Sequence, residues 1–150
     1  MIKTFKGKLS SYIAADPVNT GKMRIRLSTN NGKTGYMIRK LQVIGTDVTG
    51  RDQESVVQVF SVDPGTPTGA IDFDSPTLLA VCFYEQAAST SYFGDQAIIV
   101  DAKKINQDIW ITHDEAKGDH NVNFYLELET FNLSEMEATV ATLKDMRGRE

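Results

Sequence analysis

Apolar and polar side chains alternate along several segments of this chain. Residues 22–27 place three apolar side chains on one face and three basic side chains on the other. Residues 122–129 repeat the pattern, with Val, Phe and Leu on one face and Asn, Tyr and Glu on the other. This period of two is typical of a strand with one buried face in an antiparallel sheet. Both segments are therefore predicted to be half-buried β-strands.

Six further segments of strand length are rich in the β-branched and aromatic residues that strands favour. They are residues 2–13, 36–44, 56–62, 78–84, 97–100 and 105–113. Turn-forming Asn, Asp, Gly and Pro separate the segments, and no helix of ten or more residues connects them, as parallel strands would require. The pattern predicts an all-β fold, an antiparallel β-sandwich of about eight strands that is similar to a jelly roll.

One short C-terminal α-helix is predicted over residues 134–147. Ser134 and Glu137 have the spacing of a capping box at its start. Met136, Val140 and Leu143 recur at i, i+4 and i+7, which gives one apolar stripe. Two interpretations of the stripe remain open, because it could pack back on the sandwich or dock on a neighbouring subunit. These three residues are therefore candidate interface residues.

Length and composition support one soluble domain over residues 1–150. Apolar residues make up 41% of the chain, enough to build a core. The net charge of −4 argues against nucleic acid and anionic membranes as partners. No signal peptide or membrane-spanning run is visible. The single Cys82 lies in an apolar run, where we expect it buried, and it fits a reducing compartment such as the cytoplasm.

Familiar catalytic motifs are not found. Residues 32–34 spell Gly-Lys-Thr, but Leu27 stands where a phosphate-binding loop needs its first glycine. We expect residues 31–35 to form a hairpin turn instead. No Gly-x-Ser-x-Gly sequence occurs either. The chain is therefore predicted not to be an enzyme, with no catalytic residues and no cofactor.

One polar cluster carries residue types that ligate metals: His113, Glu115, Asp119 and His120. If residues 113 and 120 end the two arms of a hairpin closed by residues 117–119, the imidazoles approach each other, as in a zinc site. The simpler interpretation is a solvated loop. An acidic group at positions 63, 72 and 74 has similar alternatives, a Ca²⁺ site or solvated turns. Neither spacing matches a named site, so no bound metal is expected.

Three aromatic residues are candidates for surface recognition. Tyr92 and Phe93 lie in a polar loop, where they could form a platform for a sugar ring. Trp110 alternates with Asp108 and Thr112, which places it on the less apolar face of its strand. It is a candidate for a subunit interface or a sugar platform, unless its own domain covers it.

Three C-terminal segments carry a resemblance to known proteins: residues 105–113, 123–129 and 137–145. They resemble the C-terminal third of small virion structural proteins of marine bacteriophages. The resemblance carries no catalytic motif and transfers no functional residue.

The resemblance and the fold together imply a viral structural protein. We expect a capsid or capsid-decorating subunit that binds copies of itself or other capsid proteins, assembled in the host cytoplasm and located in the virion. The alternative is a carbohydrate-binding module on a host-recognition appendage. A metal-dependent enzyme using the His113 cluster is a third and weaker hypothesis.

Overall fold

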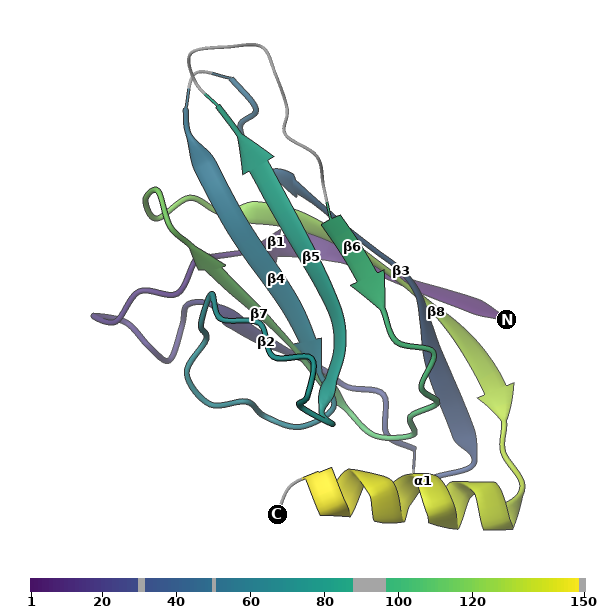
Figure 1. The fold of residues 1–150 in the computed structure, drawn as a ribbon. Helices are drawn as coiled ribbons and strands as arrows, with labels where there is room; N and C mark the ends of the chain where they lie inside the picture. Colours follow the sequence, from purple (N-terminus) through teal and green to yellow (C-terminus); the bar gives the residue numbers. More distant parts are fainter. Residues whose placement is uncertain (30–31, 50, 88–96, 149–150) are drawn as a thin grey trace.

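The computed structural model describes all residues except 30–31, 50, 88–96 and 149–150. Two antiparallel sheets face each other, and one α-helix lies across one end of them (Figure 1). The predicted all-β sandwich with a short C-terminal helix is confirmed.

The three-stranded sheet has the order β1 (Ile2–Leu9), β8 (Val122–Asn132), β3 (Thr34–Gly45). The five-stranded sheet has the order β2 (Lys22–Ile25), β7 (Ile109–Glu115), β4 (Gln53–Phe60), β5 (Leu78–Gln86), β6 (Ala97–Val100). Strands 1 and 8, 2 and 7, and 4 and 5 are paired, and β3 also contacts β6. These nested pairs resemble those of a jelly roll, except that β6 pairs with β5 in the five-stranded sheet instead of with β3.

The topology corrects two turn predictions. Residues 31–35 were expected to close a hairpin, but β2 and β3 lie in different sheets. The same holds for residues 117–119, because β7 pairs with β4 and β2 while β8 pairs with β1 and β3. Both connections cross from one sheet to the other. Alternation and strand-type composition predicted the strand regions, but neither contains information about which strands pair.

The core fills the space between the two sheets. Along β8 the residues alternate between buried and partly exposed, as predicted. Leu126 and Leu128 from β8, Leu41 from β3, Val57 from β4 and Ile109 from β7 are all fully buried. Cys82 is fully buried among them, and burial raises the pKa of its thiol to about 12. A thiol with this pKa stays protonated and unreactive at neutral pH.

The long connection from β4 to β5, residues 61–77, covers part of the outer face of the five-stranded sheet. The outward-facing Gln58 is nevertheless buried, because its amide Nε2 donates to the carbonyl oxygens of Thr68 and Ala70, at 3.1 Å each. One polar side chain therefore fixes the middle of this connection on the sheet.

The helix α1 (Glu135–Gly148) begins after Ser134, which caps it as predicted. The backbone N–H of Glu137 donates to the Ser134 hydroxyl, which itself donates to the Glu137 carboxylate, both at 3.2 Å. Asn106 holds the helix to the sandwich, since its Nδ2 donates to the Thr142 hydroxyl at 2.9 Å and to the Ala138 carbonyl oxygen at 3.3 Å. Ala138 is buried. The helix thus packs through small and polar residues and not through its apolar stripe.

Candidate functional site

The interior of the sandwich becomes polar at the end opposite α1. Ser55 and His113 face each other from β4 and β7, and both are fully buried. His113 Nε2 lies 2.9 Å from the Ser55 hydroxyl, and its Nδ1 lies 3.2 Å from the carbonyl oxygen of Leu9 at the end of β1. Gln53 Nε2 donates to the same hydroxyl at 3.0 Å. This chain of hydrogen bonds joins the two sheets.

The partners of His113 determine its protonation. A carbonyl oxygen only accepts hydrogen bonds, so Nδ1 carries the proton toward Leu9 and Nε2 accepts from Ser55. Burial lowers the pKa of His113, although the Leu9 carbonyl and nearby carboxylates oppose this shift. The ring is therefore neutral at pH 7. A serine and a histidine in this geometry have the parts of a nucleophile and base, but no surface of either is exposed.

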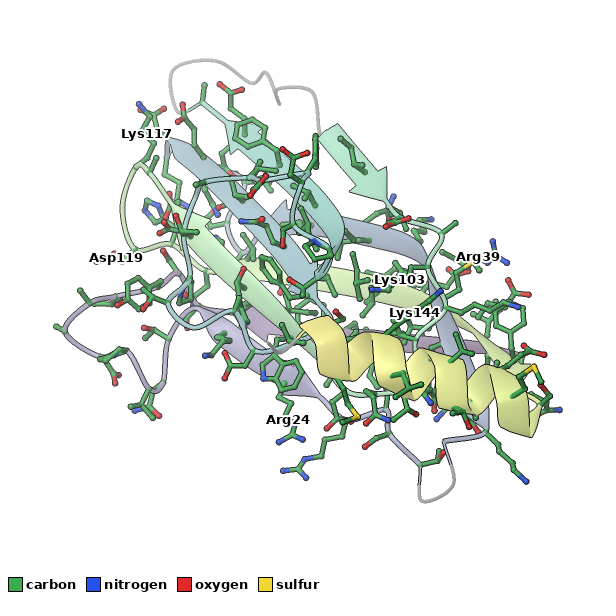
Figure 2. The ribbon with its side chains drawn as sticks, turned by 60° about the horizontal axis from the view of Figure 1, so that its bottom comes forward. Arg24, Arg39, Lys103, Lys117, Asp119 and Lys144 are labelled. Carbon is green, nitrogen blue, oxygen red and sulfur yellow. The ribbon has the colours of Figure 1, made fainter. Side chains whose placement is uncertain are left out.

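The four metal-ligand candidates are not brought together. His113 points into the core, whereas His120 lies at the rim, where its Nδ1 is 2.8 Å from Glu115 Oε1 and its N–H donates to Oε2 at 2.6 Å. Asp119 is exposed beside them (Figure 2). Among the described residues no group of three His, Cys, Asp or Glu side chains is close enough to hold a metal. The hairpin geometry behind the zinc hypothesis was wrong, because β7 and β8 lie in opposite sheets.

The acidic residues of the 61–77 connection form turns and ion pairs. Asp63 binds Lys22 Nζ at 2.6 Å and accepts the N–H of Gly65 at 2.9 Å. Asp72 accepts the N–H of Asp74 at 2.9 Å. These contacts agree with the interpretation as turn residues, and among the described residues no carboxylates gather into a site for a cation.

Asp108 organises the start of β7. The segment 105–113 was predicted as one strand, but β7 begins only at Ile109. Asp108 Oδ1 accepts the N–H groups of Leu27 and Ser28 at 2.7 and 2.9 Å, and Oδ2 binds Arg24 Nε at 2.8 Å. Burial opposes the ionisation of Asp108, but these hydrogen bonds outweigh it and lower the pKa to about 2. The carboxylate thus replaces backbone pairing where β2 ends.

Of the three aromatic candidates for surface recognition, the structure describes only Trp110. Tyr92 and Phe93 lie outside the described residues. Trp110 is on the outer face of the five-stranded sheet, as predicted, and it is half-buried. The Arg24 guanidinium lies 5.3 Å from the centre of its ring, and β2, which carries Arg24, pairs with β7 alongside. This cation–π contact covers one face of the indole, so a sugar could stack there only by displacing Arg24.

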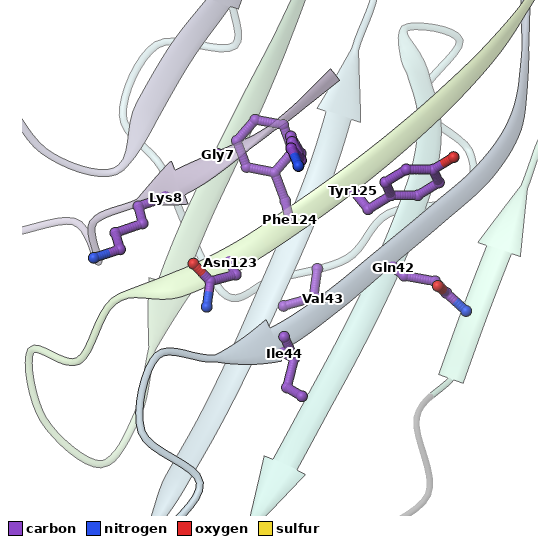
Figure 3. Close-up of a pocket in the computed structure, with 9 residues that line it drawn as sticks. Gly7, Lys8, Gln42, Val43, Ile44, Asn123, Phe124 and Tyr125 are labelled. Carbon is purple, nitrogen blue, oxygen red and sulfur yellow. The ribbon is translucent and has the colours of Figure 1, made fainter. Parts of the chain in front are cut away.

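A hollow of about 730 Å³ lies on the outer face of the three-stranded sheet. Six outward-facing side chains surround it (Figure 3): Lys6, Lys8, Gln42, Ile44, Asn123 and Tyr125. The side chains of Val43 and Phe124 are buried in the core, so these residues contribute their backbone to its floor. Aromatic, amide and ammonium groups therefore surround a depression of ligand size. Sequence reasoning missed it, because the three strands are far apart in the chain.

A groove of about 650 Å³, here named the helix groove, runs along α1. Apolar side chains line its floor and charged side chains its rim: Leu133, Met136, Val140 and Ala141 with Asp101, Lys103, Lys104, Glu137 and Lys144. Lys103 and Lys144 lie on this side of the molecule (Figure 2). The predicted interface residues Met136, Val140 and Leu143 are 79%, 45% and 48% exposed. The stripe is therefore available to a partner.

The comparisons with known proteins give no family. No protein-family model matches the chain, and no curated protein is significantly similar to it. The helix α1, in the described part of the chain, is too short and too polar to cross a lipid bilayer.

Proposed function

We propose that this protein is a structural subunit of a virus particle, a capsid or capsid-decorating β-sandwich that acts by self-association or by binding a shell. The observation that carries the proposal is the apolar stripe of α1. Met136, Val140 and Leu143 lie in a well-capped helix, and the fold leaves all three exposed.

The apolar stripe adds little to the stability of the monomer. The contacts of α1 with the sandwich come from Asn106, Ala138 and Thr142, which lie on another face of the helix. Met136 is largely exposed, and Val140 and Leu143 keep about half of their surface in water, so burial of the stripe contributes only part of its full apolar area to folding. Grouped on one face, they mark an association surface. The resemblance of the C-terminal segments to virion proteins agrees with a partner of the capsid class.

The test is the assembly state of the purified chain. Sedimentation and mass photometry over a range of concentrations are expected to show species larger than the monomer. The variant Met136→Gln, Val140→Gln and Leu143→Gln is expected to shift the chain toward monomer, while its thermal unfolding is nearly unchanged at a concentration where the wild-type chain is also monomeric. Val18→Gln is the matched control, because Val18 is 89% exposed in the β1–β2 connection.

Two results would contradict the proposal. One is a wild-type chain that stays monomeric at every concentration and does not bind purified phage particles. The other is a stripe variant that unfolds at a markedly lower temperature than the control at a concentration where both chains are monomeric, which would mean that the stripe stabilises the monomer.

A second function, carbohydrate binding, is favoured by the hollow on the three-stranded sheet. Tyr125 offers a ring face, with the Lys40 ammonium 6.0 Å from its centre, and Gln42 and Asn123 offer amides that can bond sugar hydroxyls. The hollow is thus a second place to test for sugar binding, besides the predicted platform of Tyr92, Phe93 and Trp110. A glycan array with hits that Tyr125→Ala abolishes would support it, and an array without hits would eliminate it.

A further inference from the structure

An exposed apolar knob stands on the 61–77 connection. Phe73 is 66% exposed and Ile71 is 42% exposed, and two carboxylates alternate with them at positions 72 and 74. Asp72 accepts the N–H of Asp74 at 2.9 Å, and its carbonyl oxygen accepts the N–H of Ser75 at 3.2 Å. These bonds form a local turn that presents the side chains outward. Residues 71–74 are named the acidic knob.

The helix groove is complementary to the acidic knob. Its floor is apolar, and its rim carries Lys103, Lys104 and Lys144 against the carboxylates of Asp101 and Glu137, an excess of one positive charge. The knob combines an aromatic side chain with two negative charges. Apolar surface would therefore meet apolar surface, and carboxylates would meet ammonium groups, as in specific protein interfaces.

Knob and groove lie on one continuous band of the surface. Lys103 from the groove rim donates to the carbonyl oxygen of Pro76, just after the knob, at 3.2 Å. Asp101 lines both the helix groove and a second hollow that contains Phe73 and Ile99. The knob thus adjoins the edge of the groove that carries Asp101 and Lys103.

We propose that two copies of this chain pair along this band, each inserting its acidic knob into the helix groove of the other. A twofold axis near Asp101 and Lys103 brings the knob of one copy onto the groove of its partner and makes the same contact twice. The inference rests on the proposed function of self-association and names the surface that performs it.

The test exchanges charges between knob and groove. Asp74→Lys and Lys144→Glu each place like charges across both contacts of the pair, and each is expected to raise the dimer dissociation constant on the order of tenfold. Phe73→Ser is expected to raise it at least as much, because an aromatic anchor is removed twice. Asp119→Lys is the matched control, an exposed aspartate on a distant loop, and is expected to leave the constant unchanged.

Restored dimer affinity in a mixture of the two variants tests this contact specifically. A mixture of Asp74→Lys chains with Lys144→Glu chains is expected to form heterodimers of wild-type affinity, because both contacts then pair opposite charges. The chain with both substitutions is expected to dimerise with itself again. Both results follow only if position 74 of one copy faces position 144 of the other.

Three outcomes overturn the inference. If both single variants associate like the wild type while the α1 stripe variant does not, self-association is retained and the knob is not involved. If the mixture grows beyond dimers, the contact is not reciprocal. If the wild-type chain does not associate with itself at all, this inference fails, and the proposed function fails with it only if the chain also does not bind purified phage particles.

Discussion

The carboxylate of Asp108 is predicted to be the main source of acid sensitivity at the start of β7. Its side chain is 5% exposed and is held by two backbone N–H groups and Arg24. In Asp108→Asn the amide oxygen still accepts from Leu27 and Ser28, but the charge that binds Arg24 is lost. The substitution therefore isolates the ionisation of this group.

The magnitude follows from the pKa of Asp108. The value falls from 3.8, its ordinary value, to about 2 in the folded protein. Each unit is worth about 1.4 kcal/mol, so ionised Asp108 contributes about 2 kcal/mol to stability. Because the folded pKa is the lower one, this contribution is complete above pH 4 and is lost as the pH falls from about 4 to 2. Asp108→Asn should therefore be less stable than wild type by about 2 kcal/mol at pH 7 and nearly equal to it at pH 2.

Urea unfolding at several pH values between 7 and 2 measures this difference, with the fluorescence of Trp110 and circular dichroism as signals. Asp63→Asn is the matched control. Its side chain is 54% exposed, and exposed ion pairs contribute at most about 1 kcal/mol. A stability difference for Asp108→Asn that is the same at pH 7 and pH 2 would refute the reasoning. So would a control variant that loses as much as Asp108→Asn.

Three further predictions follow from buried groups. Burial lowers the pKa of His113, so the neutral ring makes its full contribution to the free energy of unfolding above pH 6.5. Below pH 6.5 the unfolded chain binds the proton, and this free energy falls by up to about 1.4 kcal/mol per pH unit. In urea unfolding, its slope against pH should be smaller for His113→Gln, and an equal slope would contradict this. Gly45→Ala should destabilise the folded protein by about 1–3 kcal/mol in the same assay, because its new Cβ would lie 2.8 Å from two buried glutamine oxygens. Gly69→Ala is the control and should be neutral, because the nearest atom to its new Cβ is 3.7 Å away. Cys82 should resist a thiol reagent at pH 8 in the native state and react rapidly in urea, because burial raises its pKa to about 12; fast native labelling would show that the core opens.

The connectors have a larger part in this fold than their sequence indicates. Residues 105–108 were predicted to belong to the strand of β7, yet only Ile105 forms a bridge, with Tyr36 of β3. Asn106 and Asp108 instead bind the helix and the β2–β3 connection through their side chains. Polar side chains that satisfy backbone groups at strand ends look like ordinary turn residues in a sequence.

The sequence by itself determined the elements of this protein. Alternation of apolar and polar residues identified two strand regions, and segments rich in β-branched and aromatic residues identified the other six, while the Ser134–Glu137 spacing located the start of α1. These are local properties, because each depends on residues within one or two turns or a few strand positions.

Only the tertiary structure decided which surfaces meet. Strand pairing joins residues far apart in the chain, so the separation of β7 from β8, and with it of His113 from His120, could not be derived from spacing. The orientation of α1 was decided by Asn106, which binds Ala138 and Thr142 and leaves Met136 exposed. An amphipathic pattern shows that a face is apolar. What covers that face depends on side chains that the fold brings together.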